Sequence, residues 1–315
     1  MDALDLIGAV DIGGTKIAVG LVNRAGQLLA RRDMPTQADL GPQDAVMRIA
    51  KTLREILKDC RGSLVGIGIG STGPVYPMTG EIGRLDFLSG WEGFNIVQEL
   101  SSAFHLPAAM ENDADAAALG EAVWGAGKGA TRFLYVTVST GIGTGFVIDE
   151  KLYRGVDGSH PEMGHHIIDP AGPLCSCGGC GCWESLASGP AIVKWMNDPG
   201  FASAEAICSA AEKGHARARE AVEREGQYLG IGLANLVTLF VPDVIALGGG
   251  VMKSRHLFWN QIEASIRKIC GYVPYEKVRI LPAELGYQAG LVGAACVWLH
   301  RYSKRLGASY GFTAG

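Results

Sequence analysis

Four cysteines lie close together in the segment Cys175-Ser176-Cys177-Gly178-Gly179-Cys180-Gly181-Cys182, and two histidines, His165 and His166, shortly precede them. Three thiolates and one imidazole hold zinc in a closed tetrahedral site, in which no position remains for a catalytic water. We therefore predict a structural zinc site with four ligands: His165, Cys175, Cys177 and Cys182. Cys180 and His166 are left outside this set. A cysteine trio that includes Cys180 is one alternative, and a loop of free thiols is another.

A second group with chemistry is Asp11-Ile12-Gly13-Gly14-Thr15-Lys16. Gly13 and Gly14 allow backbone N–H groups to approach an anion closely, and Thr15 and Lys16 add further donors. Asp11 can position the hydrated Mg²⁺ that accompanies a nucleotide. Because the Walker pattern G-x-x-x-x-G-K-[ST] is absent, the segment predicts a phosphate-binding turn of another type, with an ordinary hairpin turn as the alternative.

Two further glycine-rich segments offer related chemistry. The segment from Ser139 to Gly145 repeats the combination of hydroxyls and glycines, and it predicts a second phosphate-binding turn with five members: Thr140, Gly141, Gly143, Thr144 and Gly145. A third cluster follows an apolar strand and leaves no side chains in the way of a flat ring, so we assign it to the adenosine: Gly248, Gly249 and Gly250. Two phosphate-binding turns in two halves of the chain predict a cleft that closes on one polyphosphate.

Asp113 is the candidate acid–base group. The tripeptide Glu111-Asn112-Asp113 follows the strand-like segment 106–110 and precedes an alanine-rich helix over 114–124. This order places Asp113 at the end of a strand, where the sheets of α/β proteins bind ligands. A carboxylate there can cap the helix. It can also accept the proton of a substrate hydroxyl as that hydroxyl attacks a γ-phosphate.

The segment Gly68-Ile69-Gly70-Ser71-Thr72-Gly73 matches the dinucleotide-binding pattern G-x-G-x-x-G and raises a dehydrogenase as a rival function. That fingerprint must open a helix, whereas here Pro74-Val75-Tyr76-Pro77 follows and prevents a helix start. We therefore predict a loop that lines a sugar site, with Thr72 and Gly73 near the ligand.

The composition bounds the partners that these groups can serve. The chain has 315 residues, enough to split into two lobes, and its 28 Lys+Arg against 32 Asp+Glu give a formal net charge of −4. That balance offers no electrostatic footprint for nucleic acid or an anionic membrane surface. No apolar run reaches the roughly 18 residues of a membrane span, and the first residues lack the cationic start of a signal peptide. We therefore expect a cytoplasmic protein with neither nucleic acid nor membrane as a partner.

The elements that would position these groups alternate between strands and helices. Segments 7–22 and 133–149 each consist of an apolar run, a glycine turn and a second apolar run, so we predict two β-hairpins in a duplicated architecture. Apolar spacing predicts further strands over 64–69 and 244–247 and helices over 42–58, 216–240 and 289–304. This alternation predicts an α/β fold. We expect one lobe from 1–114 plus 297–315 and the other from 115–296.

Taken together, these residues resemble the ROK family of sugar kinases, of the actin-like, hexokinase-like ATPase superfamily. The resemblance spans nearly the whole chain, and its most specific parts are Glu162-x-Gly164-His165 and Cys175-x-Cys177-Gly178-x-x-Gly181-Cys182-x-Glu184. It implies a two-lobed actin-like/hexokinase-like fold with duplicated halves and a zinc-stabilised loop. It also implies ATP, Mg²⁺ and structural Zn²⁺ as cofactors, and a homodimer or homotetramer.

The same resemblance implies roles for individual residues. Asp113 looks like the catalytic base, and four residues look like ligands of sugar hydroxyls: Asn112, Glu162, His165 and Glu184, with His165 also binding zinc. The activity implied is ATP-dependent phosphorylation of a hexose primary hydroxyl, with conversion of glucose to glucose 6-phosphate as the first choice.

Some segments favour other substrates or functions. The segment 160–165 and Leu186-Ala187-Ser188-Gly189-Pro190 are similar to fructokinase members, and Ser71-Thr72-Gly73 is similar to N-acetylmannosamine kinases. Glucokinase-like members often show an asparagine ahead of Leu-Pro-Gly-Trp, where this chain has Asp86-Phe87-Leu88-Ser89-Gly90-Trp91. A sugar-binding sensor is the non-enzyme alternative. Repressors of the family carry a DNA-binding domain before the kinase-like body, and we expect no room for one here because the first turn begins at Asp11.

Overall fold

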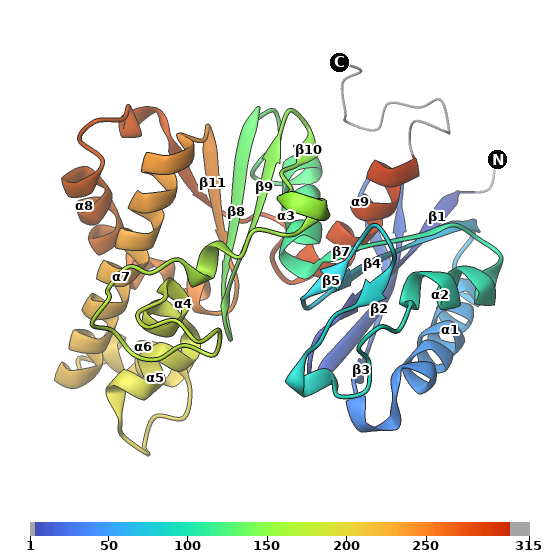
Figure 1. Cartoon of the computed structure of the whole chain (residues 1–315), viewed down its shortest axis with the longest axis horizontal. Coiled ribbons are helices and arrows are strands. Elements are labelled where there is room, and N and C mark those ends of the chain that lie inside the picture. Colours follow the sequence, from blue (N-terminus) through green and yellow to red (C-terminus); the bar gives the residue numbers. More distant parts are fainter. Residues whose placement is uncertain (1–3, 303–315) are drawn as a thin grey trace. The chain divides into compact units, whose positions relative to one another are not determined.

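The computed structural model describes residues 4–302, and in this range strands alternate with helices along the chain (Figure 1). The strands form two five-stranded sheets and a small two-stranded sheet of β5 (Val75–Tyr76) and β6 (Glu81–Ile82). The α/β class predicted from the sequence is confirmed. Within the described range no helix is both long and apolar enough to cross a lipid bilayer.

The first sheet has the strand order β3-β2-β1-β4-β7. Its members are β1 (Asp5–Ile12), β2 (Lys16–Asn23), β3 (Leu28–Pro35), β4 (Ser63–Ser71) and β7 (Ala108–Asn112). Strands β1 and β2 pair antiparallel, so the hairpin predicted over 7–22 is confirmed. Because β1, β4 and β7 run parallel, their carboxyl ends lie at one edge of the sheet.

Both faces of the first sheet are covered because side chains alternate along its strands. Leu6, Val10 and Ile12 of β1 pack in one buried cluster with residues of α1 (Pro42–Lys58) and α2 (Ile96–Phe104). Ile7 and Ala9 pack in another cluster with α9 (Ala289–Tyr302). Figure 1 shows α1 and α2 beside this sheet.

The second sheet has the order β10-β9-β8-β11-β12. Its strands are β8 (Arg132–Val138), β9 (Ile142–Ile148), β10 (Lys151–Leu152), β11 (Val244–Gly248) and β12 (Arg279–Pro282). In both sheets the first three strands along the chain are neighbours in reverse order, and two later strands extend the other side. This repeated order is what a duplicated architecture predicts.

The other α-helices of the described range are α3, which packs against β4 and β7, and five helices of the second half of the chain, among which α4, α5, α6 and α8 pack against α7. Their bounds are α3 (Asp113–Trp124), α4 (Trp183–Ala187), α5 (Gly189–Met196), α6 (Ala204–Glu212), α7 (Ala216–Phe240) and α8 (Trp259–Ile269). Helix α7 has the bounds predicted from the sequence. After Gly250 the chain forms a 3₁₀ helix over Val251–Leu257 before α8 begins.

The described chain divides into two compact units. Unit 1 contains the residues up to Gly129, then Gly145–Pro161, and the chain from Glu284 onward; unit 2 contains Ala130–Thr144 and Glu162–Ala283. Helix α3 packs against α9, and α9 packs against β1 and β4, so both helices group with the first sheet. The units therefore change at other places than 114 and 296, where we expected the lobes to change. Of the expected segment 297–315, residues 303–315 lie outside the described range.

The G-x-G-x-x-G segment lies mostly in a strand, and Gly68 makes room for a neighbouring helix to pack against that strand. Gly68 and Gly70 lie in β4, and the strand is followed by a turn and by β5, with no helix at its end. A Cβ on Gly68 would overlap the carbonyl oxygen of Ala294 in α9, and a Cβ on Gly66, two residues earlier, would overlap Trp298. Alternate glycines thus let α9 lie close against β4.

We expect Gly68→Ala to lower the stability of the protein by about 3 kcal/mol, because the added methyl group would meet backbone atoms that cannot rotate away. Urea unfolding followed by circular dichroism measures the effect. The matched control is Gly271→Ala, since nothing lies within 4 Å of a Cβ at that position. The control should stay within about 0.5 kcal/mol of the wild type. Equal midpoints for the two variants would contradict this account of the glycines.

Candidate active site

Unit 1 brings two predicted carboxylates to the same edge of the first sheet. Asp11 lies near the carboxyl end of β1 and pairs in register with Gly70 of β4, which pairs with Glu111 of β7. Asp113 follows β7 as the first residue of α3. A Cβ built on Gly70 would lie 3.9 Å from Asp11 Oδ1 and 3.8 Å from the Asp113 Cα. Asp11 and Asp113 therefore flank Gly70, at the edge where parallel strands end.

Asn112 is the residue that caps α3. Its Oδ1 accepts hydrogen bonds from the backbone N–H of Ala114 at 2.8 Å and of Asp115 at 3.4 Å. Asp113 Oδ1 also accepts a hydrogen bond from the Ala114 N–H, at 2.8 Å, which fixes the direction of this carboxylate. The capping role that the sequence left open for Asp113 is thus carried mainly by its neighbour.

The predicted Thr72-Gly73 loop lies beside these groups. Thr72 N donates to the Ile12 carbonyl at 2.9 Å, and a Cβ on Gly73 would lie 2.8 Å from Asn112 Nδ2. The structure therefore brings together three segments that are far apart in the sequence: the first glycine turn, residues 72–73, and Asn112 with Asp113.

The first glycine turn is closed by a hydrogen bond from Gly13 N to the Lys16 carbonyl, of 2.9 Å. Thr15 and Lys16 are exposed, and Lys16 Nζ lies 3.4 Å from Asp33 Oδ2. A Cβ on Gly14 would lie 2.7 Å from the ring of Phe87, so glycine is needed where this half-exposed ring covers the turn. Phe87 was not among the predicted site residues, and its position depends on tertiary packing.

Electrostatics at this edge suit a cation. Burial, and next the neighbouring Asp113 carboxylate, raise the pKa of Asp11 to about 7, although Lys16 and Arg31 act in the opposite direction. Gly290 of α9 lies against the Asp11 carboxylate so closely that a Cβ there would overlap it. Two carboxylates that repel one another form the oxygen-rich surroundings that Mg²⁺ prefers. The residues present therefore fit the predicted magnesium-binding role of Asp11.

We expect the stability of Asp11→Asn relative to the wild type to rise with pH. A carboxyl group whose pKa is raised by folding contributes fully to stability below its unfolded value of 3.8, and this contribution is lost as the pH rises to about 7. Asparagine has no such loss. Asp11 is partly exposed, so solvent screens part of this effect. Between pH ~5 and pH ~8, the unfolding free energy of Asp11→Asn should rise by about 2 kcal/mol relative to that of the wild type.

Urea midpoints, measured without nucleotide or Mg²⁺, check this expectation. Burial also raises the pKa of Glu111 to about 7, against the opposing effect of Arg154, but Glu111 is present in both proteins and its effect cancels. A difference that does not change with pH would mean that the Asp11 carboxyl group ionises normally in the folded protein.

Charged residues that the sequence analysis did not single out lie behind Asp113 in unit 1. Arg154 forms an ion pair with Glu111 and lies 4.0 Å from Asp115, and His160 Nδ1 lies 2.8 Å from Asp115 Oδ2. Asp115 is completely buried. These pairs hold Glu111 and Asp115, which lie two residues before and two residues after Asp113. The only signal in the sequence was the spacing of Glu111 and Asp115 around Asp113.

Unit 2 brings the four predicted zinc ligands together. The ligand atoms of His165, Cys175, Cys177 and Cys182 all lie within 4.8 Å of one another. Cys175 Sγ lies 3.5 Å from His165 Nδ1, and Cys177 Sγ lies 3.5 Å from Cys182 Sγ. A zinc tetrahedron with Zn–S bonds of about 2.3 Å and a Zn–N bond of about 2.0 Å has edges of about 3.5 to 3.8 Å. The donor set therefore fits zinc in both chemistry and size.

Cys180 and His166, which were left out of the predicted ligand set, lie outside this cluster. Cys180 is exposed and is not among the grouped ligands of the described chain. His166 packs on Trp183 and its Nδ1 lies 2.5 Å from the Met163 carbonyl oxygen.

Two of the clustered thiols have shifted pKa values. Burial raises the pKa of the Cys182 thiol to about 12, whereas the Gly179 N–H lowers the pKa of the Cys177 thiol. A metal ion that binds here must therefore displace the Cys182 proton.

The second glycine turn is shorter than predicted. Strand β9 begins at Ile142, so the turn proper is formed by Ser139, Thr140 and Gly141. Thr144 lies inside the strand with its side chain buried, and Gly145 packs against Ala118 of α3. Gly143, Thr144 and Gly145 thus belong to β9 and not to the turn, and their predicted part in phosphate binding stays a prediction.

The third glycine cluster has a structural explanation for two of its members. A Cβ on Gly248 would lie 2.5 Å from Tyr135 Oη, and Gly249 has a φ of +92° and contacts the Val138 carbonyl. Gly250 is exposed, and a Cβ there would lie 4.0 Å from Ser139 Oγ. Close packing against β8 thus accounts for Gly248 and Gly249, and only Gly250 offers an open surface. Adenosine binding at this cluster stays a prediction.

Glu162 and Glu184 lie at the two ends of the zinc-binding segment. Glu162 is exposed and directly precedes a 3₁₀ helix over Met163–His165. Glu184 lies in α4, and its Oε2 accepts a hydrogen bond from Ile142 N at 2.9 Å, while its Oε1 lies 4.0 Å from His165 Nε2. The structure therefore groups Glu184 with both the zinc cluster and the second glycine turn.

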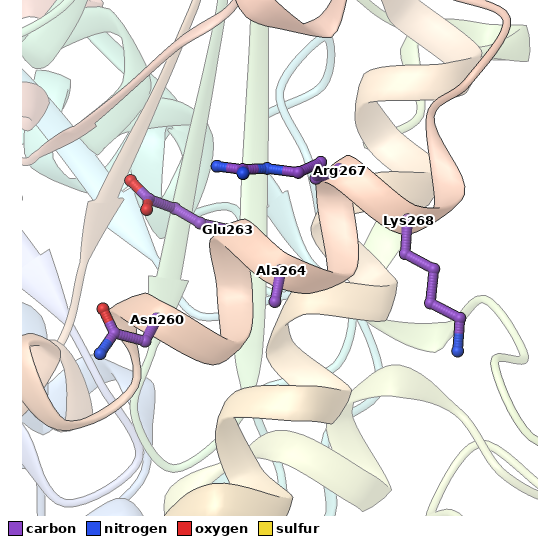
Figure 2. Close-up of a pocket in the computed structure, with 5 residues that line it drawn as sticks. All are labelled: Asn260, Glu263, Ala264, Arg267 and Lys268. Atoms are coloured by element: carbon purple, nitrogen blue, oxygen red, sulfur yellow. The ribbon is translucent and has the colours of Figure 1, made fainter.

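A surface hollow in unit 2 is unrelated to these groups. It has a volume of about 370 Å³ and is lined by residues of α8 alone (Figure 2): Asn260, Glu263, Ala264, Arg267 and Lys268. None of the predicted site residues contributes to it. A hollow lined by a single helix does not enclose a small molecule as functional pockets do, so we assign no function to it.

Comparisons with known proteins find matches over most of the chain. Residues 7–301 match the ROK family model. The chain is 31% identical over 316 residues to a glucokinase of Thermotoga maritima, covering 94% of this chain and 98% of that one. It resembles the crystal structure of a ROK family glucokinase from Streptomyces griseus in complex with glucose and AMPPNP, with a TM-score of 0.79, 32% identity and coverage of 92% and 98%. It is also 34% identical over 215 residues to the xylose repressor of Bacillus subtilis, which is 68% of this chain and 56% of the repressor.

Proposed function

This chain belongs to the ROK family and is a sugar kinase, and we propose that it transfers the γ-phosphoryl group of ATP to the primary hydroxyl of a hexose, with glucose as the first candidate. The observation that carries this proposal is the position of Asp113 beside Asp11 at the carboxyl ends of parallel strands. The glucokinases among the similar proteins support glucose.

We propose that Asp113 is the general base. Its carboxylate accepts the proton of the hydroxyl as that oxygen attacks the γ-phosphorus, and the bond from Ala114 N to Oδ1 holds the carboxylate in place. Asp11 orients the hydrated magnesium, and the backbone of residues 13–16 and 139–141 binds phosphate oxygens. Mg²⁺ bound with ATP neutralises charge on the transferred group. Thr72, Gly73, Asn112, Glu162, His165 and Glu184 are the proposed sugar-binding residues.

Zinc serves positioning in this proposal and takes no part in bond making. A closed site with one histidine and three cysteines leaves no coordination position for a reactant. By fixing the segment 165–184, the metal orients His165 and Glu184, which belong to the proposed set of hydroxyl ligands.

The sugar is identified by a coupled assay of ADP release over glucose, fructose, mannose, N-acetylmannosamine and N-acetylglucosamine. We expect the highest kcat/KM with glucose. A preference for fructose or N-acetylmannosamine would replace the proposed substrate by one of these alternatives, in line with the segments 160–165 and 71–73. The absence of steady ATP turnover with every sugar, together with sugar binding, would favour a sensor, a possibility raised by the similarity to the xylose repressor. A cytoplasmic location and a homodimer or homotetramer stay predictions.

A further inference from the structure

The segment that carries the zinc ligands also holds the second glycine turn in place. Gly189 N donates a hydrogen bond of 2.8 Å to the Ser139 carbonyl, and Glu184 Oε2 accepts one of 2.9 Å from Ile142 N. The turn also packs closely against the segment that carries the zinc ligands. A Cβ on Gly141 would overlap the Glu184 carboxylate, and a Cβ on Gly164 would overlap the Ile142 carbonyl oxygen.

The other oxygen of Glu184 faces the zinc cluster. His165 Nδ1 lies 3.5 Å from Cys175 Sγ, so this nitrogen faces the metal position. His165 Nε2, on the opposite side of the ring, lies at the ion-pair distance of 4.0 Å from Glu184 Oε1. A line of adjacent groups thus runs from the metal position through His165 and Glu184 to the Ile142 N–H of the turn.

We propose that Glu184 is a positioning residue that couples zinc binding to the conformation of the phosphate-binding turn over 139–142, so that zinc supports nucleotide binding as well as sugar binding. The proposal rests on the proposed function, because it takes that turn to bind phosphate. It adds to the hydroxyl-ligand role of Glu184, which concerns only the sugar.

Two physical effects act along this line. A metal on Nδ1 leaves the ring proton on Nε2, and a carboxylate opposite that N–H is the usual partner of a metal-bound histidine. The oriented carboxylate then accepts the Ile142 N–H. Ile142 is buried, and without this carboxylate its N–H would lose a charge-assisted hydrogen bond and stay without a partner. Holding Glu184 in place therefore stabilises the end of the turn at Ile142.

The test measures binding of Mg·ADP to the zinc-loaded full chain by isothermal titration calorimetry, without any sugar. We expect Glu184→Ala to weaken Mg·ADP about tenfold. Glu184→Gln keeps an oxygen that can accept from Ile142 N, so it should stay within about threefold of the wild type. Glu205→Gln is the control: Glu205 is an exposed carboxylate in the first turn of α6 with no proposed role, and its replacement should leave Mg·ADP binding unchanged.

Zinc removal supplies the second half of the test. In the wild type, chelation should weaken Mg·ADP by about the same factor as Glu184→Ala, and in Glu184→Ala it should have little further effect. Circular dichroism and zinc content verify that each protein is folded and loaded. Unchanged Mg·ADP affinity in Glu184→Ala, or equal losses on chelation in both proteins, would overturn the coupling while leaving the proposed kinase intact. A wild type that binds no Mg·ADP at all would overturn the proposed function itself.

Discussion

Replacing Asp113 by asparagine should reduce kcat by about 10³-fold or more, with little change in the affinity for the sugar. General base catalysis contributes about 10²- to 10⁴-fold, and here the base must remove a proton from a neutral alcohol. The asparagine keeps an oxygen that can accept from Ala114 N, the contact made by Asp113 Oδ1, so the start of α3 should keep its geometry. Loss of rate without loss of binding is therefore the expected signature.

The measurement combines steady-state ADP release with calorimetric titration of glucose. Glu99→Gln is the control, because Glu99 is an exposed carboxylate in the first turn of α2 and has no proposed role. It should leave both kcat and sugar affinity unchanged. An Asp113→Asn variant that retains turnover within tenfold of the wild type would rule out Asp113 as the base, and Asp11 would become the carboxylate to examine in its place.

The sequence predicted those elements whose pattern is local. Helix α7 has the predicted bounds, and the hairpin over 7–22 is present, because apolar spacing and a glycine turn are sufficient signals for each. The glycines of β4 show where local reading fails. Gly66 and Gly68 make room for Trp298 and Ala294, which lie more than 200 residues further along the chain. The sequence around these glycines does not indicate which distant residues pack against them.

The site follows the same division. The cluster of His165 with three cysteines was found because residue type and spacing carry its chemistry. The role of Asp113 stays a prediction. The pairing of His160 with Asp115 and the bond from Ile142 N to Glu184 were not found, since each joins segments more than 40 residues apart. The extent of the second glycine turn was not found either, for a related reason. The residue types of the second glycine turn do not tell where the turn ends and β9 begins.

Cys177→Ser should abolish zinc binding and lower sugar affinity by at least about 100-fold. Zinc binding to a site of this kind stabilises the folded segment by a free energy on the order of 10 kcal/mol. A hydroxyl in place of one thiolate loses much of this binding free energy. Without the metal, the segment 165–184 loses the restraint that orients His165 and Glu184. Cys177 is the most informative of the three cysteines because it is exposed, whereas Cys175 and Cys182 are buried and their replacement would also disturb packing.

Cys180→Ser is the matched control, since Cys180 is also exposed and lies three residues away in the same loop. Zinc content per chain by mass spectrometry and glucose titration by calorimetry are measured for both variants. The grouping of ligand atoms predicts that Cys180→Ser keeps its zinc and its sugar affinity. The reverse pattern, with zinc lost only from Cys180→Ser, would establish the alternative cysteine trio. A zinc-free Cys177→Ser that binds glucose normally would separate the metal from the sugar site altogether, because the segment would then hold its side chains in place without it.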